Sequence, residues 1–98
     1  MIYDLIDTFP KNELFAISQQ MQRCSVSIPS NIAEGCSRKS DKEFSRFIQI
    51  SMGSSFELET QLLIALERNY FNDKYIFELL NVLQKRLNAL NQKLTTND

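Results

Sequence analysis

The stretch SVSIPSNIAEGCSRKS, residues 25–40, decides how this chain folds. Its first part continues an apolar pattern at helical spacing, and its last five residues, CSRKS, are polar and form a short loop. Pro29 interrupts the pattern. Because a proline inside a helix removes one backbone hydrogen bond, we expect a kink there or, alternatively, a break. Gly35 is expected to end the helix in a left-handed conformation.

The helix that contains Pro29 is predicted over residues 11–35. Its apolar stripe consists of Leu14, Ile17, Met21, Cys24, Ile28 and Ile32. Before it, apolar residues again recur at helical spacing, at Ile2, Leu5, Ile6 and Phe9. They predict a short first helix of about two turns. Pro10 ends this helix, because proline restricts the residue before it.

The longest predicted helix covers residues 41–68. Ser40 and Glu43 fit a capping box, in which the serine caps the helix start and the glutamate reaches back. The core face of this helix consists of Phe44, Phe47, Ile48, Leu58, Leu62, Ala65 and Leu66. Small residues in its middle let a neighbouring backbone come close: Ser51, Gly53, Ser54 and Ser55.

The last helix is predicted from about residue 73 onward. Asn69 closes the preceding helix, and Asn72 is predicted as the N-cap, with Asp73 favourable at the positive helix end. The core positions of this last helix form a heptad seam: Ile76, Leu80, Leu83, Leu87, Leu90 and Leu94. Because the seam is short, it favours packing in a bundle over a free coiled coil.

Length and composition limit what the chain can be. Its 98 residues allow one domain, 1–98, and its two glycines and two prolines disfavour disordered and turn-rich β classes. A net charge of −1 gives no bulk attraction to nucleic acid or membrane. Histidine is absent, which removes Ser-His-Asp and Cys-His nucleophile systems and most zinc sites. We therefore expect a protein that is not an enzyme and that uses no metal or cofactor.

The sequence also bears on location. No window approaches a membrane span of roughly 18 consecutive apolar residues, and the N-terminus lacks the basic region of a signal peptide. Cys24 and Cys36 do not have the spacing of a Cys-x-x-Cys motif. We expect a cytoplasmic protein with no membrane partner. Both thiols are expected to be reduced, and both cysteines to be buried or half-buried.

The run of residues 25–40 also carries a resemblance. Together with FPKNELFAISQQMQRC (9–24) and EFSRFIQISMGSSFELETQLLIAL (43–66), it is similar to the bacterial 23S rRNA intervening-sequence, or four-helix-bundle, family. The string Ser-Ile-Pro-Ser-Asn-Ile-Ala-Glu-Gly (27–35) is specific to that pattern. The resemblance implies an all-α, antiparallel up-down four-helix bundle that forms a ring, typically a homopentamer. It also implies a fold similar to that of the accessory protein of diversity-generating retroelements, which binds nucleic acid and a reverse transcriptase.

The beginning of the chain departs from the family pattern. Family members usually have a fuller first helix, often with a tryptophan, before the segment that matches Ile2-Tyr3, whereas this chain has no tryptophan. We therefore expect a shortened first helix, or a natural start that lies upstream of Met1. A shortened helix would leave an apolar groove along the other three helices, which a partner or another subunit would fill.

Basic residues are the best candidates for function. They gather around the loop and the following helix start: Arg38, Lys39, Lys42 and Arg46. Lys42 and Arg46 are four residues apart and share a helix face. Positive charge opposes the dipole at a helix N-terminus, so helix stability does not explain this placement. Arg23 is a further candidate, and the cluster would bind RNA or DNA phosphates. Alternatively, it is a solvated surface whose charge Asp41 and Glu43 offset.

Other residues of the family pattern are candidates for a structural role: Pro29, Asn31, Glu34, Gly35, Gly53, Glu57 and Glu59. Asn31 and Glu34 could hold a ligand or an interface. Alternatively, Asn31 bonds backbone groups that Pro29 frees, and Glu34 pairs with a basic residue near the bend. Glu57 and Glu59 point to different faces, and one of them is expected to form an ion pair between helices or subunits.

These observations favour a non-catalytic, ring-forming protein. We expect it to bind RNA or DNA weakly through the basic loop, as an adaptor to a nucleic-acid enzyme. The alternative is a scaffold that binds a protein partner and no nucleic acid.

Overall fold

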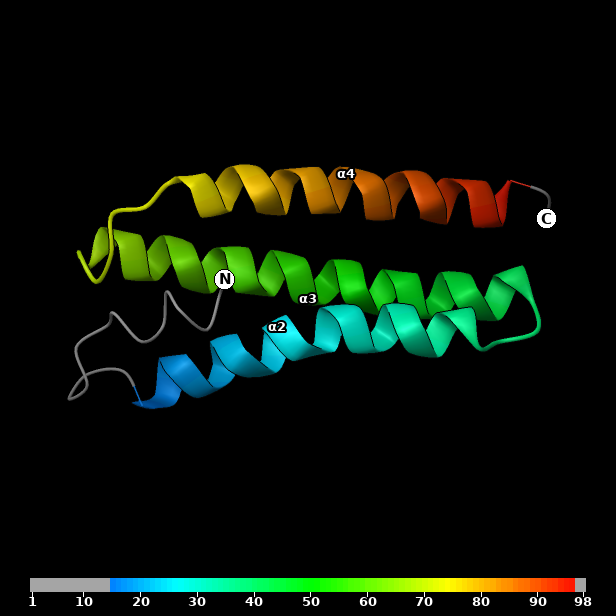
Figure 1. Cartoon of the computed structure of the whole chain (residues 1–98), viewed down its shortest axis with the longest axis horizontal. Helices are drawn as coiled ribbons and strands as arrows, with labels where there is room; N and C mark the ends of the chain where they lie inside the picture. The colour runs from blue at the N-terminus through cyan, green and yellow to red at the C-terminus, as the bar shows by residue number, and fades with distance from the viewer. Residues whose placement is uncertain (1–14, 97–98) are drawn as a thin grey trace.

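A computed structural model describes residues 15–96, which contain three helices and no strand. They are α2 (Phe15–Cys36), α3 (Asp41–Glu67) and α4 (Tyr75–Thr95). The three helices lie side by side, and each runs in the direction opposite to the one before it (Figure 1). The all-α class is therefore confirmed. The first helix expected before Pro10 lies outside the described residues, as does the start of the helix predicted from residue 11.

The central helix, α3, packs on both of the others, and every helix–helix packing within residues 15–96 joins neighbours in sequence. The larger core cluster contains Met21, Cys24, Ile28, Leu58, Leu62, Ala65, Phe71, Ile76 and Leu80. A smaller cluster near the loop of residues 37–40 contains Ile48, Leu87 and Leu94. The apolar stripes predicted for all three helices therefore face one another. No helix in the described part of the chain is apolar over a length that would cross a membrane.

Helix α2 continues through Pro29, so the alternative of a break is wrong. In Figure 1 its N-terminal part slopes away from α3, whereas its C-terminal part runs alongside. The Asn31 side chain lies near the proline, where its Nδ2 donates to the carbonyl oxygen of Ser27 at 2.8 Å. Pro29 frees the carbonyl of Ser25, four residues before it, and not that of Ser27. The interpretation that Asn31 bonds a backbone group freed by Pro29 is therefore not borne out by this contact.

The prediction that Gly35 ends the helix in a left-handed conformation is wrong. Gly35 lies inside α2, which ends one residue later, and no glycine in the described residues has a positive φ. Gly35 is buried, and a Cβ built on it would lie 2.7 Å from Cδ1 of Phe44 and 3.0 Å from Cβ of Phe47. The glycine is therefore required by the close approach of α2 to α3, not by a left-handed helix end.

The small residues in the middle of α3 behave in two ways. Ser51 and Ser55 are fully buried, and Ser51 Oγ donates to the carbonyl oxygen of Ile28 at 2.9 Å, which ties α3 to α2. Gly53 is exposed, and a Cβ on it would meet no atom within 4 Å. The expectation of close backbone approach is therefore confirmed for Ser51. The Ser55 hydroxyl instead donates to Met52 in its own helix at 2.7 Å, and Gly53 meets no neighbour within the described residues.

Local hydrogen bonds fix both ends of α3. Ser40 Oγ accepts from the Glu43 backbone N–H at 3.1 Å, which confirms the serine half of the capping box. No bond from the Glu43 side chain back to residue 40 is found among the described residues. At the other end, Asn69 has a φ of 62° and closes the helix, also as predicted. The backbone N–H groups of residues 69 and 70 donate to the carbonyl oxygens of residues 66 and 65, both at 3.0 Å. This pair of bonds is a Schellman motif, which satisfies the last carbonyls of the helix.

The start of α4 differs from the prediction. Lys74, rather than Asn72, is the N-cap residue, and its side chain makes no capping bond. The carboxylate of Asp73 caps the helix instead, because its Oδ1 accepts from the Tyr75 backbone N–H at 2.9 Å. Asn72 and Asp73 are both residue types that cap helices, and Asp73 is the one that caps α4.

Candidate nucleic-acid interface

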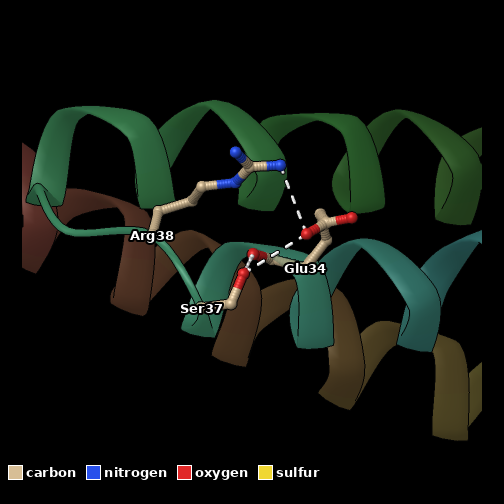
Figure 2. A network of polar contacts seen from close by, with 3 residues as sticks. All are labelled: Glu34, Ser37 and Arg38. Atoms are coloured by element: carbon tan, nitrogen blue, oxygen red, sulfur yellow. Dashed lines mark hydrogen bonds and ion pairs between the residues drawn. The ribbon is translucent and has the colours of Figure 1, made fainter.

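Arg38, the first residue of the predicted basic cluster, is held by its neighbours (Figure 2). Its Nη2 lies 3.2 Å from Oε2 of Glu34, and its Cζ lies 4.7 Å from the ring centroid of Phe47. Ser37 Oγ also donates to Glu34, to the backbone carbonyl at 2.7 Å and to Oε2 at 3.3 Å. The structural interpretation of Glu34 is therefore confirmed, and its pairing offsets the charge of Arg38.

Lys42 and Arg46 instead line one cavity of about 230 Å³, between the start of α3 and the end of α4. Ser45, Gln49 and Thr95 complete its lining, which contains no acidic side chain. The α3 residues occur at positions 42, 45, 46 and 49, so they share one helix face. Both cations are exposed, and neither forms an ion pair within the described residues. We call this the cationic cavity.

A hydrogen-bond network fixes the wall of the cationic cavity. Ser45 is only 3% exposed, and its Oγ donates to Oδ1 of Asn91 on α4 at 2.5 Å. The same hydroxyl oxygen accepts from Nε2 of Gln49 at 3.1 Å. The two helices are thereby joined directly beside the cations, so the spacing of the cavity does not depend on mobile side chains alone.

Sequence reasoning missed the three neutral residues of this cavity. Ser45 and Gln49 could have been found, because polar residues three and seven positions after Lys42 lie on the same face. Thr95 could not, because its contribution depends on where the end of α4 meets the start of α3.

The remaining basic candidates lie elsewhere. Lys39 is exposed in the loop, and Arg23 lines a different cavity, between α2 and α3. Arg23 is 15 residues before Arg38, which corresponds to roughly 20 Å along a helix. The structure therefore brings Lys42 and Arg46 together and leaves Arg23 apart from them.

The two glutamates of the family pattern also separate. Glu59 Oε1 accepts from Nε2 of Gln84 on α4 at 3.1 Å, so this contact between helices is a hydrogen bond to a neutral amide. Glu57 lines the cavity that contains Arg23. The prediction of different faces is confirmed. Neither glutamate forms an ion pair between helices in the chain as described. The alternative, an ion pair between subunits, stays a prediction.

The two cysteines differ in exposure. Cys24 is buried, whereas Cys36 is exposed, so the expectation of a buried or half-buried residue is wrong for Cys36. Burial raises the pKa of the Cys24 thiol, and the negative charge of Glu57 raises it further. Cys24 is therefore a protonated core residue at neutral pH.

An apolar groove lies between α2 and α4, over α3. Its volume is about 260 Å³, and it is lined by Ser25, Ile28, Pro29, Leu58, Ile76, Leu79, Leu80 and Leu83. Apolar side chains form almost all of its surface. In the described part of the chain, no helix covers this groove.

A family model matches most of the chain. The family model described as 23S rRNA-intervening sequence protein matches residues 1–92. No curated protein matches the chain.

Proposed function

The chain belongs to the 23S rRNA-intervening sequence protein family, and from this premise we propose that it is a non-catalytic protein that binds RNA or DNA phosphates through the cationic cavity. The observation that supports this proposal is the pairing of Lys42 and Arg46 in a cavity without acidic residues. Ser45, Gln49 and Thr95 add hydroxyl and amide donors suited to phosphate oxygens. Contacts of this kind position a nucleic acid and do not select its sequence.

Assembly belongs to the same proposal. We infer that a further helix completes a four-helix bundle and that the subunits form a homo-oligomeric ring, a pentamer by family resemblance. Such a ring would present one cationic cavity per subunit, and simultaneous binding would raise the affinity without any new contact. With a net charge of −1 per chain, each cavity alone binds weakly.

Charge reversal tests the cationic cavity. We expect Lys42→Glu with Arg46→Glu to weaken binding of a fluorescent single-stranded RNA and a DNA duplex by at least about ten-fold at low salt. Two phosphate contacts contribute about −1.4 to the slope of log affinity against log salt for single strands, per engaged subunit of the parent protein. Fluorescence anisotropy across a salt series measures both quantities.

The matched control is Lys85→Glu with Arg86→Glu, which changes the net charge equally at two exposed positions of α4. We expect this control to change affinity less than two-fold, roughly, because it leaves the cationic cavity intact. Equal losses in both double variants would show that net charge alone governs binding, and would contradict the proposal.

A protein scaffold is the second candidate, and the apolar groove favours it. Uncovered apolar grooves commonly receive a helix from a partner. The same titration separates the two functions when light scattering accompanies it. A protein that still assembles but retains no RNA or DNA at low salt would support the scaffold.

A further inference from the structure

A second cavity, which no α4 residue lines, opens between α2 and α3. Its volume is about 250 Å³, and its lining consists of Gln20, Arg23, Cys24, Ser27, Ser54 and Glu57. The four α2 residues occur at positions 20, 23, 24 and 27, which share one helix face, and the two α3 residues are three apart. All of the lining residues except Cys24 are polar or charged. We call it the α2–α3 cavity.

Two opposite charges line this cavity from different helices. Arg23 belongs to α2 and Glu57 to α3, and both act on the pKa of Cys24 between them: Glu57 raises it and Arg23 lowers it. Yet no ion pair within 4.0 Å joins Arg23 to Glu57 in the described structure. Each charge is therefore available to a ligand group of opposite sign.

Neutral polar groups are fixed beside these charges. The hydroxyl oxygens of Ser27 and Ser54 lie 2.8 Å apart and hydrogen-bond across the two helices. Asn31 Nδ2 donates to Ser27 Oγ at 3.0 Å, which holds that hydroxyl in place. The two serine hydroxyls in the wall of the α2–α3 cavity are therefore already ordered before a ligand binds.

A buried acceptor without a partner lies beside the same cavity. Gln61 follows Glu57 by one helical turn and interacts with Cys24, which lines the cavity. Only 7% of Gln61 is exposed, and its Oε1 has no hydrogen-bond partner. Gln61 itself does not line the cavity, so this oxygen belongs to the packing behind Cys24 and is not a contact for a ligand.

We propose that the α2–α3 cavity binds a small zwitterion of the α-amino acid class. The ligand carboxylate binds the guanidinium of Arg23, which offers a forked pair of donors. The ligand ammonium binds the carboxylate of Glu57, on the opposite helix. The volume lies just below the usual range of ligand pockets, which excludes a nucleotide and suits a molecule of amino-acid size.

An NMR titration with L-serine as the probe tests the proposal. We expect amide shifts at residues around the α2–α3 cavity that saturate in the millimolar range. N-acetyl-L-serine lacks the ammonium charge and L-serinamide lacks the carboxylate, so each should bind about ten-fold more weakly. Equal binding of all three compounds, or no shifts at this cavity, would overturn the assignment.

Variants test the two charges one at a time. Arg23→Gln and Glu57→Gln replace exposed residues, so the fold should persist, and each should weaken L-serine binding by about ten-fold. Arg86→Gln on α4 is the matched control and should leave binding unchanged. Alkylation gives a second readout within one molecule: L-serine should slow the reaction of Cys24 and leave exposed Cys36 unaffected. The proposal would be contradicted if L-serine protected neither thiol and bound equally well to the Arg23→Gln and Glu57→Gln variants.

Discussion

Gly35 and Gly53 lie on neighbouring helices in opposite surroundings. A methyl group at Gly35 would meet the Phe44 ring at 2.7 Å, whereas one at Gly53 would meet nothing within 4 Å. We therefore expect Gly35→Ala to lower the free energy of unfolding by about 1–3 kcal/mol through overpacking. Gly53→Ala should raise it by about 1 kcal/mol, because alanine is the better helix former.

Urea denaturation measures both substitutions, and each serves as the control for the other. The two changes add the same methyl group to a helix, so their opposite signs report on the surroundings alone. If Gly35→Ala stabilised the protein, the close approach of α2 to α3 would not be what requires a glycine.

The two cysteines are expected to react with alkylating reagents at different rates. The thiolate is the reactive form, and burial together with Glu57 raises the pKa of Cys24. We expect iodoacetamide to modify exposed Cys36 at least about ten-fold faster at pH 8. Mass spectrometry of the two peptides over time measures the ratio, and similar rates would show that the Cys24 region opens readily.

The same pKa shift makes stability depend on pH. A raised pKa in the folded state means that the unfolded chain loses the thiol proton first as pH rises. The contribution of Cys24 is fully present below about pH 8.5 and is lost as pH rises through its folded pKa. The free energy of unfolding should therefore fall more steeply above that pH in the parent protein than in Cys24→Ala. Parallel pH curves would contradict this assignment.

Single residues also show where sequence reasoning stops. The pairing of Glu34 with a basic residue could be expected, because the loop that follows the helix contains two cations, Arg38 and Lys39. Which of the two cations pairs could not be, because both lie beyond the end of α2. Gly35 could not be interpreted correctly, because a glycine near the end of a helical pattern is typical of a helix end. The Phe44 ring that decides its role belongs to the next helix.

At the scale of elements, Asn69 governs how α3 ends. Its φ of 62° strains any residue with a branched Cβ, whereas glycine adopts it freely. We expect Asn69→Gly to preserve or raise the stability, and Asn69→Val to lower it by about 1–2 kcal/mol. Thermal unfolding followed by circular dichroism measures both. Equal stability of the two variants would show that the helix end relaxes without cost.

The extents of the helices were the most predictable property of the chain. Helix α3 was predicted over residues 41–68 and covers Asp41–Glu67, because a capping serine and a closing asparagine bracket a clear apolar period. The start of α4 was less predictable, because Asn72 and Asp73 are both good capping residues. Only the hydrogen bond from Tyr75 to Asp73 distinguishes them.

At the scale of the whole molecule, the role of the basic cluster depends on where the fold places each of its members. The sequence placed four basic residues within nine positions, from Arg38 to Arg46. Folding divides them, because Arg38 faces Glu34 and Phe47 while Lys42 and Arg46 face the end of α4. Thr95, at the end of α4, is distant in sequence from Lys42 and Arg46, so one-dimensional spacing could identify the cluster but not its division.

The packing of each helix only on its neighbour in sequence has a kinetic consequence. The described chain consists of two helical hairpins that share α3, and neither hairpin requires the closure of a long loop. Folds dominated by such short-range contacts reach the native state quickly. Either hairpin can therefore form first, and the remaining helix then packs against α3.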